Sequence, residues 1–322
     1  MNTSFSLFDI IGDVHGCASK LEELLRRLGY RARAGAYRHP ERTAVFVGDL
    51  IDRGPQQLET VDLVRRMVDS GTACMVLGNH ELNALGWVTP DPARPGEFLR
   101  RRLGGKGEVH YAQHRVFLEQ VGEGSPRHRE ALSWFRTLPL VLDLGSIRVA
   151  HACWDRDSVE RLTAAAPRDG VLSEEWLVAL FDKSTPLGEA MQVVVKGPEY
   201  ALKEEHAYLD KDGNPRHKAR HAWWSPEGSG MGRALVLPGG SLRLDGTPHP
   251  GFPDDPLLTP PVPAYQDRVP AFFGHYWFTG DPAPLSDALA CVDYSAVKGG
   301  PLVAYRFSGE PTLRRENFLS VV

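Results

Sequence analysis

Short apolar runs and helical repeats alternate along the first third of the chain. Residues 5–11 form an apolar run that ends at Gly12, and residues 19–28 place leucines at helical spacing. The alternation continues through an apolar run, a helical repeat and another apolar run, at residues 43–47, 58–68 and 73–77. This β-α-β-α-β order predicts neighbouring parallel strands with helices packed against the sheet.

The remaining two thirds of the chain alternate less regularly. The pattern predicts helices at residues 97–103, 109–120 and 172–181. It predicts strands at residues 138–142, 147–150, 193–195, 272–273, 288–292 and 302–307. The mixture of elements indicates an α/β protein. Three consecutive arginines, Arg100 to Arg102, are expected on a solvated helix face.

Turn-forming residues dominate the segment before the last strands. Residues 200–224 have the pattern of a hairpin around Asp212-Gly213-Asn214, and residues 238–270 are rich in proline and glycine. A loop of that length indicates an insertion or lid rather than a second core. We therefore predict one domain over residues 1–322, with a Pro/Gly-rich insertion or lid at about residues 198–270.

Polar residues of the kind that bind metals follow three of the apolar runs. Gly12 opens the sequence G-D-V-H-G, Gly48 opens G-D-L-I-D-R-G and Gly78 opens G-N-H-E. Two later histidines, His151 and His275, also follow apolar runs. Ligands of open α/β sheets bind at the carboxyl ends of strands, where glycine lets the backbone turn sharply. We expect these side chains to converge at one edge of a sheet.

The converging residues have the chemistry of a metal site. Asp13 and His15 are two residues apart, so in extended backbone they share a face and can hold one cation. Asp49 and Asn79 follow the next two predicted strands. Carboxylate, amide and imidazole together suit Mn²⁺, Fe or Zn²⁺ better than Ca²⁺. His249 and His221 compete with His275 for the place of last ligand.

The number of ligands exceeds what one open metal site needs. We therefore predict two divalent ions bridged by Asp49, with Mn²⁺ as the first choice and Fe, Zn or Ni as alternatives. Such a pair can polarise a bridging water for in-line attack on phosphorus. Arg53 can add a fork of N–H donors to phosphate oxygens. An Asp52–His80 pair can protonate the leaving group as general acid, while Glu81 is expected to be a structural partner.

At these motifs the chain resembles the phosphoprotein-phosphatase branch of the calcineurin-like metallophosphoesterases. That branch carries G-D-x-H-G, G-D-x-x-D-R-G and G-N-H-E, then two single histidines, in this order. The resemblance covers about residues 5–154 and the region of His275. It implies a β-sandwich core of two mixed sheets flanked by helices, and phosphate contact by Arg53 and Asn79. It also implies the Asp52–His80 acid pair and the metal ligands Asp13, His15, Asp49, Asn79, His151 and His275.

Two features depart from that family pattern. The gap between His151 and His275 is longer than in compact bacterial members. The second phosphate-binding arginine of the family has no clear match, and its candidates here are Lys196, Arg220 and Arg156. We choose Lys196, because it follows the predicted strand at residues 193–195.

Overall composition excludes some classes of partner. The 37 basic and 41 acidic residues give a formal charge of −4, which does not indicate a global nucleic-acid or membrane binder. The four cysteines are far apart and form no disulfide or zinc-binding pattern. No apolar stretch approaches about 18 residues. We predict a cytoplasmic protein with no membrane contact and no stable nucleic-acid complex.

The predicted reaction is hydrolysis of a phosphomonoester by direct attack of a metal-bridging hydroxide, without a phospho-enzyme. The leading substrate is phosphoserine or phosphothreonine in a protein. The alternative is a nucleotide hydrolase of the diadenosine tetraphosphatase or RNA-end phosphatase type. A catalytically silent binding scaffold is a third hypothesis. The motifs recognise only the phosphoryl group, so the pocket walls, expected at residues 89–130 and 198–270, decide among these substrates.

Overall fold

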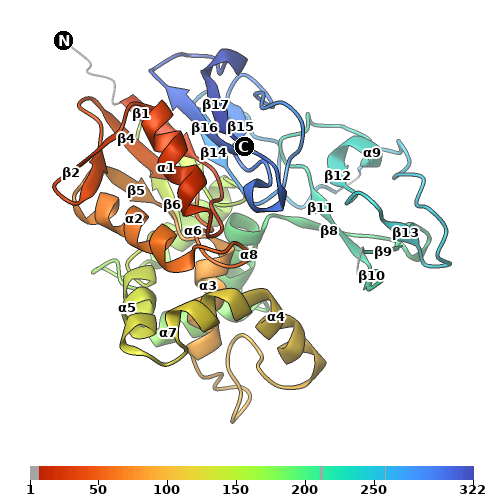
Figure 1. Cartoon of the computed structure of the whole chain (residues 1–322). Helices are drawn as coiled ribbons and strands as arrows, with labels where there is room; N and C mark the ends of the chain where they lie inside the picture. Colours follow the sequence, from red (N-terminus) through yellow and green to blue (C-terminus); the bar gives the residue numbers. More distant parts are fainter. Residues whose placement is uncertain (1–6, 211–212, 258) are drawn as a thin grey trace.

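Two mixed β-sheets stack at the centre of the molecule (Figure 1). The computed structural model describes residues 7–210, 213–257 and 259–322. In the first sheet the strand order is β17-β16-β1-β4-β5. Its strands are β1 (Leu7–Ile11), β4 (Arg42–Phe46), β5 (Ala73–Met75), β16 (Leu302–Phe307) and β17 (Phe318–Val321). Strands β1, β4 and β5 are parallel neighbours, which confirms the order predicted for the first third of the chain.

The second sheet has the strand order β15-β14-β7-β6. Its strands are β6 (Val141–Asp143), β7 (Arg148–Ala150), β14 (Ala271–Phe273) and β15 (Leu289–Cys291). Strands β7, β14 and β15 run parallel, and β6 pairs antiparallel with β7. All four strands were predicted, with bounds that differ by a few residues.

Successive side chains along a strand of the first sheet belong to different hydrophobic clusters, one on each face of the sheet. Ile10 and Val45 belong to a buried cluster between the sheets, which they share with Val149 and Phe272 of the second sheet. Ile11, the neighbour of Ile10, belongs to the larger cluster that also contains the buried faces of the helices. Side chains along a strand point alternately to opposite faces, so a strand that is buried on both faces needs a continuous apolar run.

Helices cover the sheets and fill one side of the molecule (Figure 1). Helices α1 and α2 pack against the first sheet, α3 packs against α5 and α7, and α8 packs against α6 and α7. The helices are α1 (Ala18–Arg27), α2 (Gln57–Asp69), α3 (Asn79–Val88), α4 (Gly104–Val121), α5 (Pro126–Phe135), α6 (Arg156–Ala165), α7 (Glu174–Phe181) and α8 (Pro186–Lys196). The predicted α/β class, with two mixed sheets flanked by helices, is confirmed.

The segment predicted as an insertion forms an extension to one side of the sandwich (Figure 1). It contains two small sheets, with strand orders β12-β11-β8 and β10-β9-β13. Its elements are β8 (Glu199–Ala201), β9 (Tyr208–Leu209), β10 (Pro215–Arg216), β11 (Lys218–His221), α9 (Met231–Ala234), β12 (Leu235–Val236) and β13 (Leu242–Arg243). Tyr208, Met231 and Phe252 belong to a small apolar cluster of its own. Its role as an insertion or lid stays a prediction.

The remaining elements are short. Strands β9 and β10 pair antiparallel, as the hairpin prediction requires, although Asp212 lies outside the described residues. A second hairpin follows α1, and the described residues include three 3₁₀ turns later in the chain. These elements are β2 (Arg31–Arg33), β3 (Ala36–Arg38), η1 (Glu204–His206), η2 (Ala296–Lys298) and η3 (Arg315–Asn317). The sequence pattern did not predict β2, β3, β12, β13, β17, α3, α5, α6 or α9.

The strand predicted at residues 193–195 is wrong, because these valines end helix α8. Thr185 caps this helix by accepting a hydrogen bond from the backbone N–H of Gly188 (3.1 Å), and Pro186 occupies its first turn. The cap and the proline outweigh the weak β preference of consecutive valines. Lys196 therefore ends a helix and does not follow a strand.

The helix predicted at residues 97–103 is also wrong. The backbone N–H of Arg100 donates to Gly86 of α3 (2.9 Å), and the side chain of Arg102 donates to the carbonyl of Trp87 (2.7 Å). The carboxylate of Glu97 accepts from the backbone N–H of Arg102 (3.1 Å). Contacts with the preceding helix thus replace the hydrogen bonds that a helix of its own would make.

A buried ion-pair network on the first sheet is expected to be a main determinant of stability. Asp9 of β1 is fully buried and accepts two hydrogen bonds from Arg42 and one from Arg306, each 3.0 Å long. Replacing Asp9 by alanine leaves a buried guanidinium without its carboxylate, so the free energy of unfolding should fall by about 3–5 kcal/mol. Urea denaturation measures this loss. The exposed-site control Asp69→Asn should change stability by no more than about 0.5 kcal/mol.

Candidate metal centre

The predicted ligands come together where strands of both sheets end. Asp13 lies after β1, Asp49 after β4, and Asn79 begins α3 after β5. His151 directly follows β7, and His275 lies just beyond β14. The carboxyl ends of parallel strands share one edge of a sheet, and here the edges of two stacked sheets meet. The local motifs of the sequence thus converge on one place.

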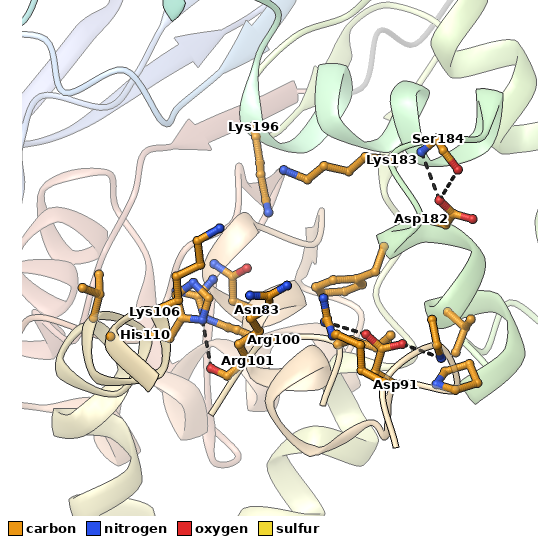
Figure 2. Close-up of a pocket in the computed structure, with 18 of the residues that line it drawn as sticks. Asn83, Asp91, Arg100, Arg101, Lys106, His110, Asp182, Lys183, Ser184 and Lys196 are labelled. Atoms are coloured by element: carbon orange, nitrogen blue, oxygen red, sulfur yellow. Dashed lines mark hydrogen bonds and ion pairs between the residues drawn. The ribbon is translucent and has the colours of Figure 1, made fainter. Parts of the chain in front are cut away.

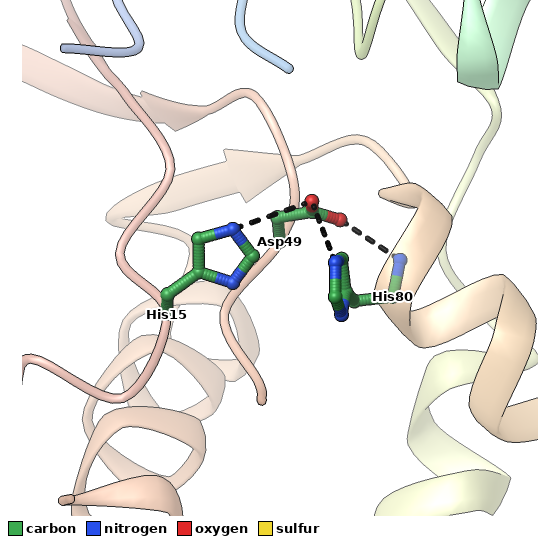
Figure 3. A group of neighbouring side chains, drawn as sticks. All are labelled: His15, Asp49 and His80. Carbon is green, nitrogen blue, oxygen red and sulfur yellow. Dashed lines mark hydrogen bonds and ion pairs between the residues drawn. The ribbon is translucent and has the colours of Figure 1, made fainter. Parts of the chain in front are cut away.

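The carboxylate of Asp49 lies at the centre of this cluster. Its Oδ2 is 3.6 Å from His15 Nε2, 3.8 Å from His80 Nε2 and 3.4 Å from His151 Nε2. Figure 3 shows the imidazoles of His15 and His80 on either side of the carboxylate. Two groups of side chains with metal-binding spacing share Asp49: one with His15 and His80, the other with His151 and His275. A bridging carboxylate needs this overlap.

Asn79 and Asp13 connect to the same cluster through His275. Asn79 Oδ1 is 2.7 Å from His275 Nδ1 and 3.0 Å from His151 Nε2. Asp13 Oδ2 accepts a hydrogen bond from the backbone N–H of His275 (3.1 Å). The competing histidines lie elsewhere, His221 in β11 and His249 in the loop after β13. The six predicted ligands are therefore neighbours, and their role as ligands stays a prediction.

Backbone carbonyls hold two of the histidines through Nδ1. His15 Nδ1 donates to the carbonyl of Ile51 (2.8 Å), and His151 Nδ1 donates to the carbonyl of Val47 (2.7 Å). These bonds fix each ring orientation and place a proton on Nδ1. Nε2 of His15 has no hydrogen-bond partner among the described residues and can act as a ligand atom. Nε2 of His151 faces Asn79 and Asp49 and must lose a proton before it can do so. Backbone carbonyls commonly support metal-binding histidines in this way.

Unsatisfied polar atoms test whether the cluster fits metal ions. Asp13 Oδ1, His15 Nε2 and His275 Nε2 are buried and have no hydrogen-bond partner among the described residues. Leaving such an atom unpaired costs about 1–3 kcal/mol. Divalent cations at the two groups would satisfy these atoms, and carboxylate, imidazole and amide form a donor set for Mn²⁺, Fe or Zn²⁺. The residues present therefore fit divalent metal ions.

The charges of the cluster are strongly coupled. Burial opposes ionisation of Asp49, but the neighbouring His151 and His80 outweigh it and hold the pKa of Asp49 well below its usual range. Burial likewise opposes the charge of His151, but Asp49 raises the pKa of His151 to about 10. Burial and the charge of His80 lower the pKa of His15 to about 3. A bound cation would take over the role of the His151 proton, so metal binding should release protons.

The backbone of the site is strained at the functional side chains. His15 (φ 44°), Asp49 (φ 54°), Asp52 (φ 70°), Arg53 (φ 74°) and His275 (φ 72°) all adopt left-handed conformations. Such conformations cost non-glycine residues about 1–3 kcal/mol each and are concentrated at active sites. The surrounding packing holds these side chains in positions that local preference disfavours.

Two positions of the site require glycine, because other residues of the cluster lie too close to leave room for a side chain. A Cβ at Gly78 would lie 2.3 Å from the backbone nitrogen of Asp49. A Cβ at Gly274 would lie 2.0 Å from Asp13 Oδ1. Glycine therefore precedes Asn79 and His275 because any side chain there would push the strand ends apart.

Asp52 is held between two histidines. Its Oδ2 accepts a hydrogen bond from His80 Nδ1 (2.5 Å), and its Oδ1 accepts one from His114 Nδ1 of α4 (2.7 Å). Burial opposes the charge of Asp52, but His114 and His80 overcome it and lower the pKa of Asp52. The predicted pair of Asp52 and His80 is thus joined by a short hydrogen bond. The other ring nitrogen of His80, Nε2, faces Asp49 at 3.8 Å. Its role in proton transfer stays a prediction.

His114 is expected to position the Asp52–His80 pair. His114→Leu should lower kcat for alkyl phosphates about tenfold, because Asp52 loses a charge-assisted hydrogen bond worth about 1.5 kcal/mol. His114→Gln keeps a donor near Asp52 and should recover most of that loss. Steady-state kinetics with alkyl and nitrophenyl esters test the role. Equal losses for both esters would indicate a merely structural histidine.

Arg53 stands at the exposed rim of the cluster. Its guanidinium lies over the ring of Trp277 (4.2 Å), and its Nη2 is 3.4 Å from His80 Nε2. Trp277 also stacks on His15, with 5.5 Å between ring centroids. Arg53 is thus held beside the predicted metal ligands with its charge accessible to an anion.

The three candidates for a second phosphate-binding residue lie in different places. Lys196 lies at the end of α8 and faces a separate pocket described below. Arg156 pairs with Asp267 on the surface (3.0 Å). The positive charge of Arg220 adds to the effect of burial in lowering the pKa of His275. Arg220 is thus electrostatically coupled to a predicted ligand, and the role predicted for Lys196 stays untested.

Two residues of the site were missed by sequence reasoning. Asp293, just after β15, accepts hydrogen bonds from the backbone N–H groups of Trp277 (2.7 Å) and Ser295 (3.0 Å) and so shapes the wall beside Asp13. The pattern of an apolar run followed by a carboxylate could have identified Asp293. His114 lies within a helix and carries no comparable local signal. Glu81, by contrast, accepts backbone hydrogen bonds from four residues, as expected of a structural partner.

A family model decides the identity of this fold and site. The model described as calcineurin-like phosphoesterase matches residues 7–186, which is more than half of the chain. The chain belongs to the calcineurin-like phosphoesterase family. The family inferred from the three motifs is therefore confirmed. The family accounts for divalent metal ions, while their number and identity stay predictions.

Relatives of this phosphoesterase carry names of nucleotide hydrolases. An asymmetrical bis(5′-nucleosyl)-tetraphosphatase of Halalkalibacterium halodurans is 57% identical over 74 residues, 23% of this chain and 30% of that protein. The match thus spans less than a third of that relative's length. A symmetrical bis(5′-nucleosyl)-tetraphosphatase of Ralstonia nicotianae is 27% identical over 320 residues, 94% of this chain and 90% of that protein.

A solved structure of a cold-active protein-tyrosine phosphatase from Shewanella is also similar. The two structures have a TM-score of 0.49 at 15% identity, and the alignment covers 98% of this chain and 80% of that chain.

Among the described residues, no helix is both long and apolar enough to cross a membrane.

Proposed function

We propose that the protein hydrolyses a dinucleoside polyphosphate, cleaving a phosphoanhydride bond of a compound such as diadenosine tetraphosphate. The alignment of 94% of the chain with a relative named as a symmetrical bis(5′-nucleosyl)-tetraphosphatase carries this proposal. An alignment of that extent includes most of residues 89–130 and 198–270, where the substrate walls were expected. The alignment therefore compares the expected substrate walls as well as the phosphoryl site.

The protein-phosphatase hypothesis, which the motifs alone placed first, has no support from the names of the curated relatives. Those names favour the nucleotide alternative. A phosphorylated protein is accordingly retained only as a competing substrate in the test below.

The metal centre of the proposal consists of Asp13, His15, Asp49, Asn79, His151 and His275, with Mn²⁺ as the first choice for two ions. When bound, the ions supply positive charge that stabilises the pentavalent transition state and lowers the pKa of a water molecule. The orphaned buried atoms of Asp13, His15 and His275 support this ligand assignment.

The side chains around the metal centre orient the substrate and move a proton. Arg53 and Asn79 donate hydrogen bonds to oxygens of the reacting phosphoryl group. The oxygen of a water molecule bonds to phosphorus while the P–O bond to the leaving phosphate breaks. The proton that this water loses passes to solvent, from which His80 afterwards regains the proton it donates. His80 gives its proton to the departing oxygen, and Asp52 holds the opposite ring nitrogen in place (2.5 Å).

A substrate comparison tests the proposal. With Mn²⁺ in excess, kcat/KM for diadenosine tetraphosphate should exceed that for a phosphoserine peptide by about a hundredfold or more, equivalent to about 2.7 kcal/mol of discrimination. Chromatography of the products distinguishes symmetrical cleavage, which gives only ADP, from asymmetrical cleavage, which gives AMP and ATP. Faster hydrolysis of the phosphopeptide would overturn the proposal.

A further inference from the structure

A large basic cavity is lined mainly by residues 91–110 on one side and by residues 178–184 and Lys196 on the other (Figure 2). Its volume is about 1100 Å³, and seven of its lining residues are lysine or arginine against two aspartates. Figure 2 shows Lys183 and Lys196 reaching into the cavity from the α8 side, opposite Arg100, Arg101 and Lys106. We call this cavity the basic pocket.

Most of the positive charge in the basic pocket is not neutralised by the protein. Arg94 pairs with Asp91 (2.5 Å), and the carboxylate of Asp182 accepts hydrogen bonds from Ser184. Five cations of the pocket form no ion pair with a carboxylate in the part of the chain that the structure describes: Arg100, Arg101, Lys106, Lys183 and Lys196. The charge repulsion among them is left for a ligand to relieve.

Two of these cations are also partly withdrawn from water. Arg100 donates to Gln113 Oε1 (2.6 Å), but its buried Nε has no hydrogen-bond partner among the residues described. Burial lowers the pKa of Arg100 to about 10. Burial, followed by the charges of Lys183 and Arg100, lowers the pKa of Lys196 to about 7. A solvated helix face, as expected for Arg100 from the sequence, would show neither property.

The basic pocket adjoins the metal centre through helix α3. Asn79 of the cluster and Asn83 of the pocket lining lie four residues apart on α3. Residues four apart on a helix share one face and are separated by about 6 Å. Arg100 also interacts electrostatically with Asp52, the partner of His80. Helix α3 therefore carries a residue of the metal cluster and a residue of the pocket lining about one turn apart.

We propose that the basic pocket is a subsite for the phosphates of the substrate that extend beyond the phosphoryl group at the metal centre. The inference rests on the proposed function and names the part of the protein that selects a polyphosphate. Diadenosine tetraphosphate carries several negative charges, which five unpaired cations can match. The volume slightly exceeds that of ordinary small-molecule sites, so it can hold phosphates together with a nucleoside. A simple monoester reaches only the metal centre.

A selectivity measurement tests the subsite. Lys106 and Lys183 are exposed and lie on opposite sides of the pocket, so Lys106→Gln/Lys183→Gln removes two charges without opening the core. In the holoenzyme the ratio of kcat/KM for diadenosine tetraphosphate to kcat/KM for p-nitrophenyl phosphate should fall about tenfold or more. The matched control Arg66→Gln/Arg168→Gln removes two exposed charges outside the pocket and should change this ratio less than about twofold.

Inhibition by inorganic tripolyphosphate tests the subsite without the nucleotide substrate. With free Mn²⁺ held constant, the concentration that halves p-nitrophenyl phosphate hydrolysis should rise about tenfold in the pocket variant and stay near the wild-type value in the control. An equal rise in both variants would show a general charge effect and would overturn the subsite, as would unchanged inhibition of the pocket variant.

The two tests separate the subsite from the proposed function. If wild-type protein leaves diadenosine tetraphosphate intact while tripolyphosphate inhibition depends on Lys106 and Lys183, the proposed substrate is wrong and the anion subsite stands. If the dinucleotide is cleaved with the same selectivity by wild-type and pocket variant, the function stands and the subsite is wrong.

Discussion

Replacing Asp49 by asparagine is expected to lower kcat for p-nitrophenyl phosphate by about a thousandfold or more and to reduce bound metal to one ion per chain or fewer. Asp49 Oδ2 lies within 3.8 Å of three histidine Nε2 atoms, and both metal-binding groups share this carboxylate. A neutral amide offers one oxygen ligand and no charge. The loss of about 4 kcal/mol of transition-state stabilisation corresponds to about a thousandfold.

Steady-state kinetics with excess Mn²⁺ and elemental analysis of dialysed protein measure the two effects together. The asparagine oxygen can still accept the backbone hydrogen bond that Asp49 receives from His80 (2.9 Å), so the fold should persist, as circular dichroism would verify. Asp69→Asn removes an exposed carboxylate from the end of α2 and serves as the control. Retention of both metal content and turnover by the Asp49 variant would refute the bridging assignment.

Replacing His80 by glutamine is expected to slow hydrolysis by an amount that depends on the leaving group of the substrate. Hydrolysis of alkyl phosphates should fall about a hundredfold or more, because an alkoxide needs a proton as it departs. Hydrolysis of p-nitrophenyl phosphate should fall less than about tenfold, because nitrophenolate leaves without one. The leaving phosphate of a dinucleotide should also give a small loss, because a phosphate whose last pKa is about 6 is a weak base. A series of esters with graded leaving groups measures the trend.

The hydrogen bond from His80 to Asp52 supplies a control for this prediction (2.5 Å). Asp52→Asn should show the same dependence on the leaving group, and the double variant should lose little more than either single variant, since the two residues act as a unit. Losses that are equal for good and poor leaving groups would rule out His80 as the general acid.

Much of the site could be predicted because its signals are local. Each of the three motifs combines an apolar strand, a glycine and polar side chains within a few residues, as with Asp13 after β1 and Asp49 after β4. Parallel neighbours bring the ends of such strands to one edge whatever the details of the loops. The close contact of Gly78 with Asp49 shows that the same glycine is needed for packing and not only for turning.

Predictions failed where tertiary contacts outweighed local preference. Three consecutive valines favoured a strand at residues 193–195, but the capped α8 buries Val194 and Val195 on one helical face. The chain before α4 has the composition of a helix, but it bonds instead to the carbonyls of α3. The secondary structure predicted around Arg100 and around Lys196 was wrong. The basic pocket between these residues therefore could not be inferred from the sequence.

The sequence by itself determined which residues end the core strands and therefore which side chains meet around Asp49, because strand, glycine and ligand are adjacent in the chain. Only the tertiary structure brought His114 to Asp52, which is 62 residues away in sequence, and gathered Arg100, Lys106 and Lys196 around one cavity. The physical reason is that contacts between segments far apart in the chain produce no periodic pattern of residues in the sequence. They arise from how helices pack, and that packing sets both burial and charge in the pocket.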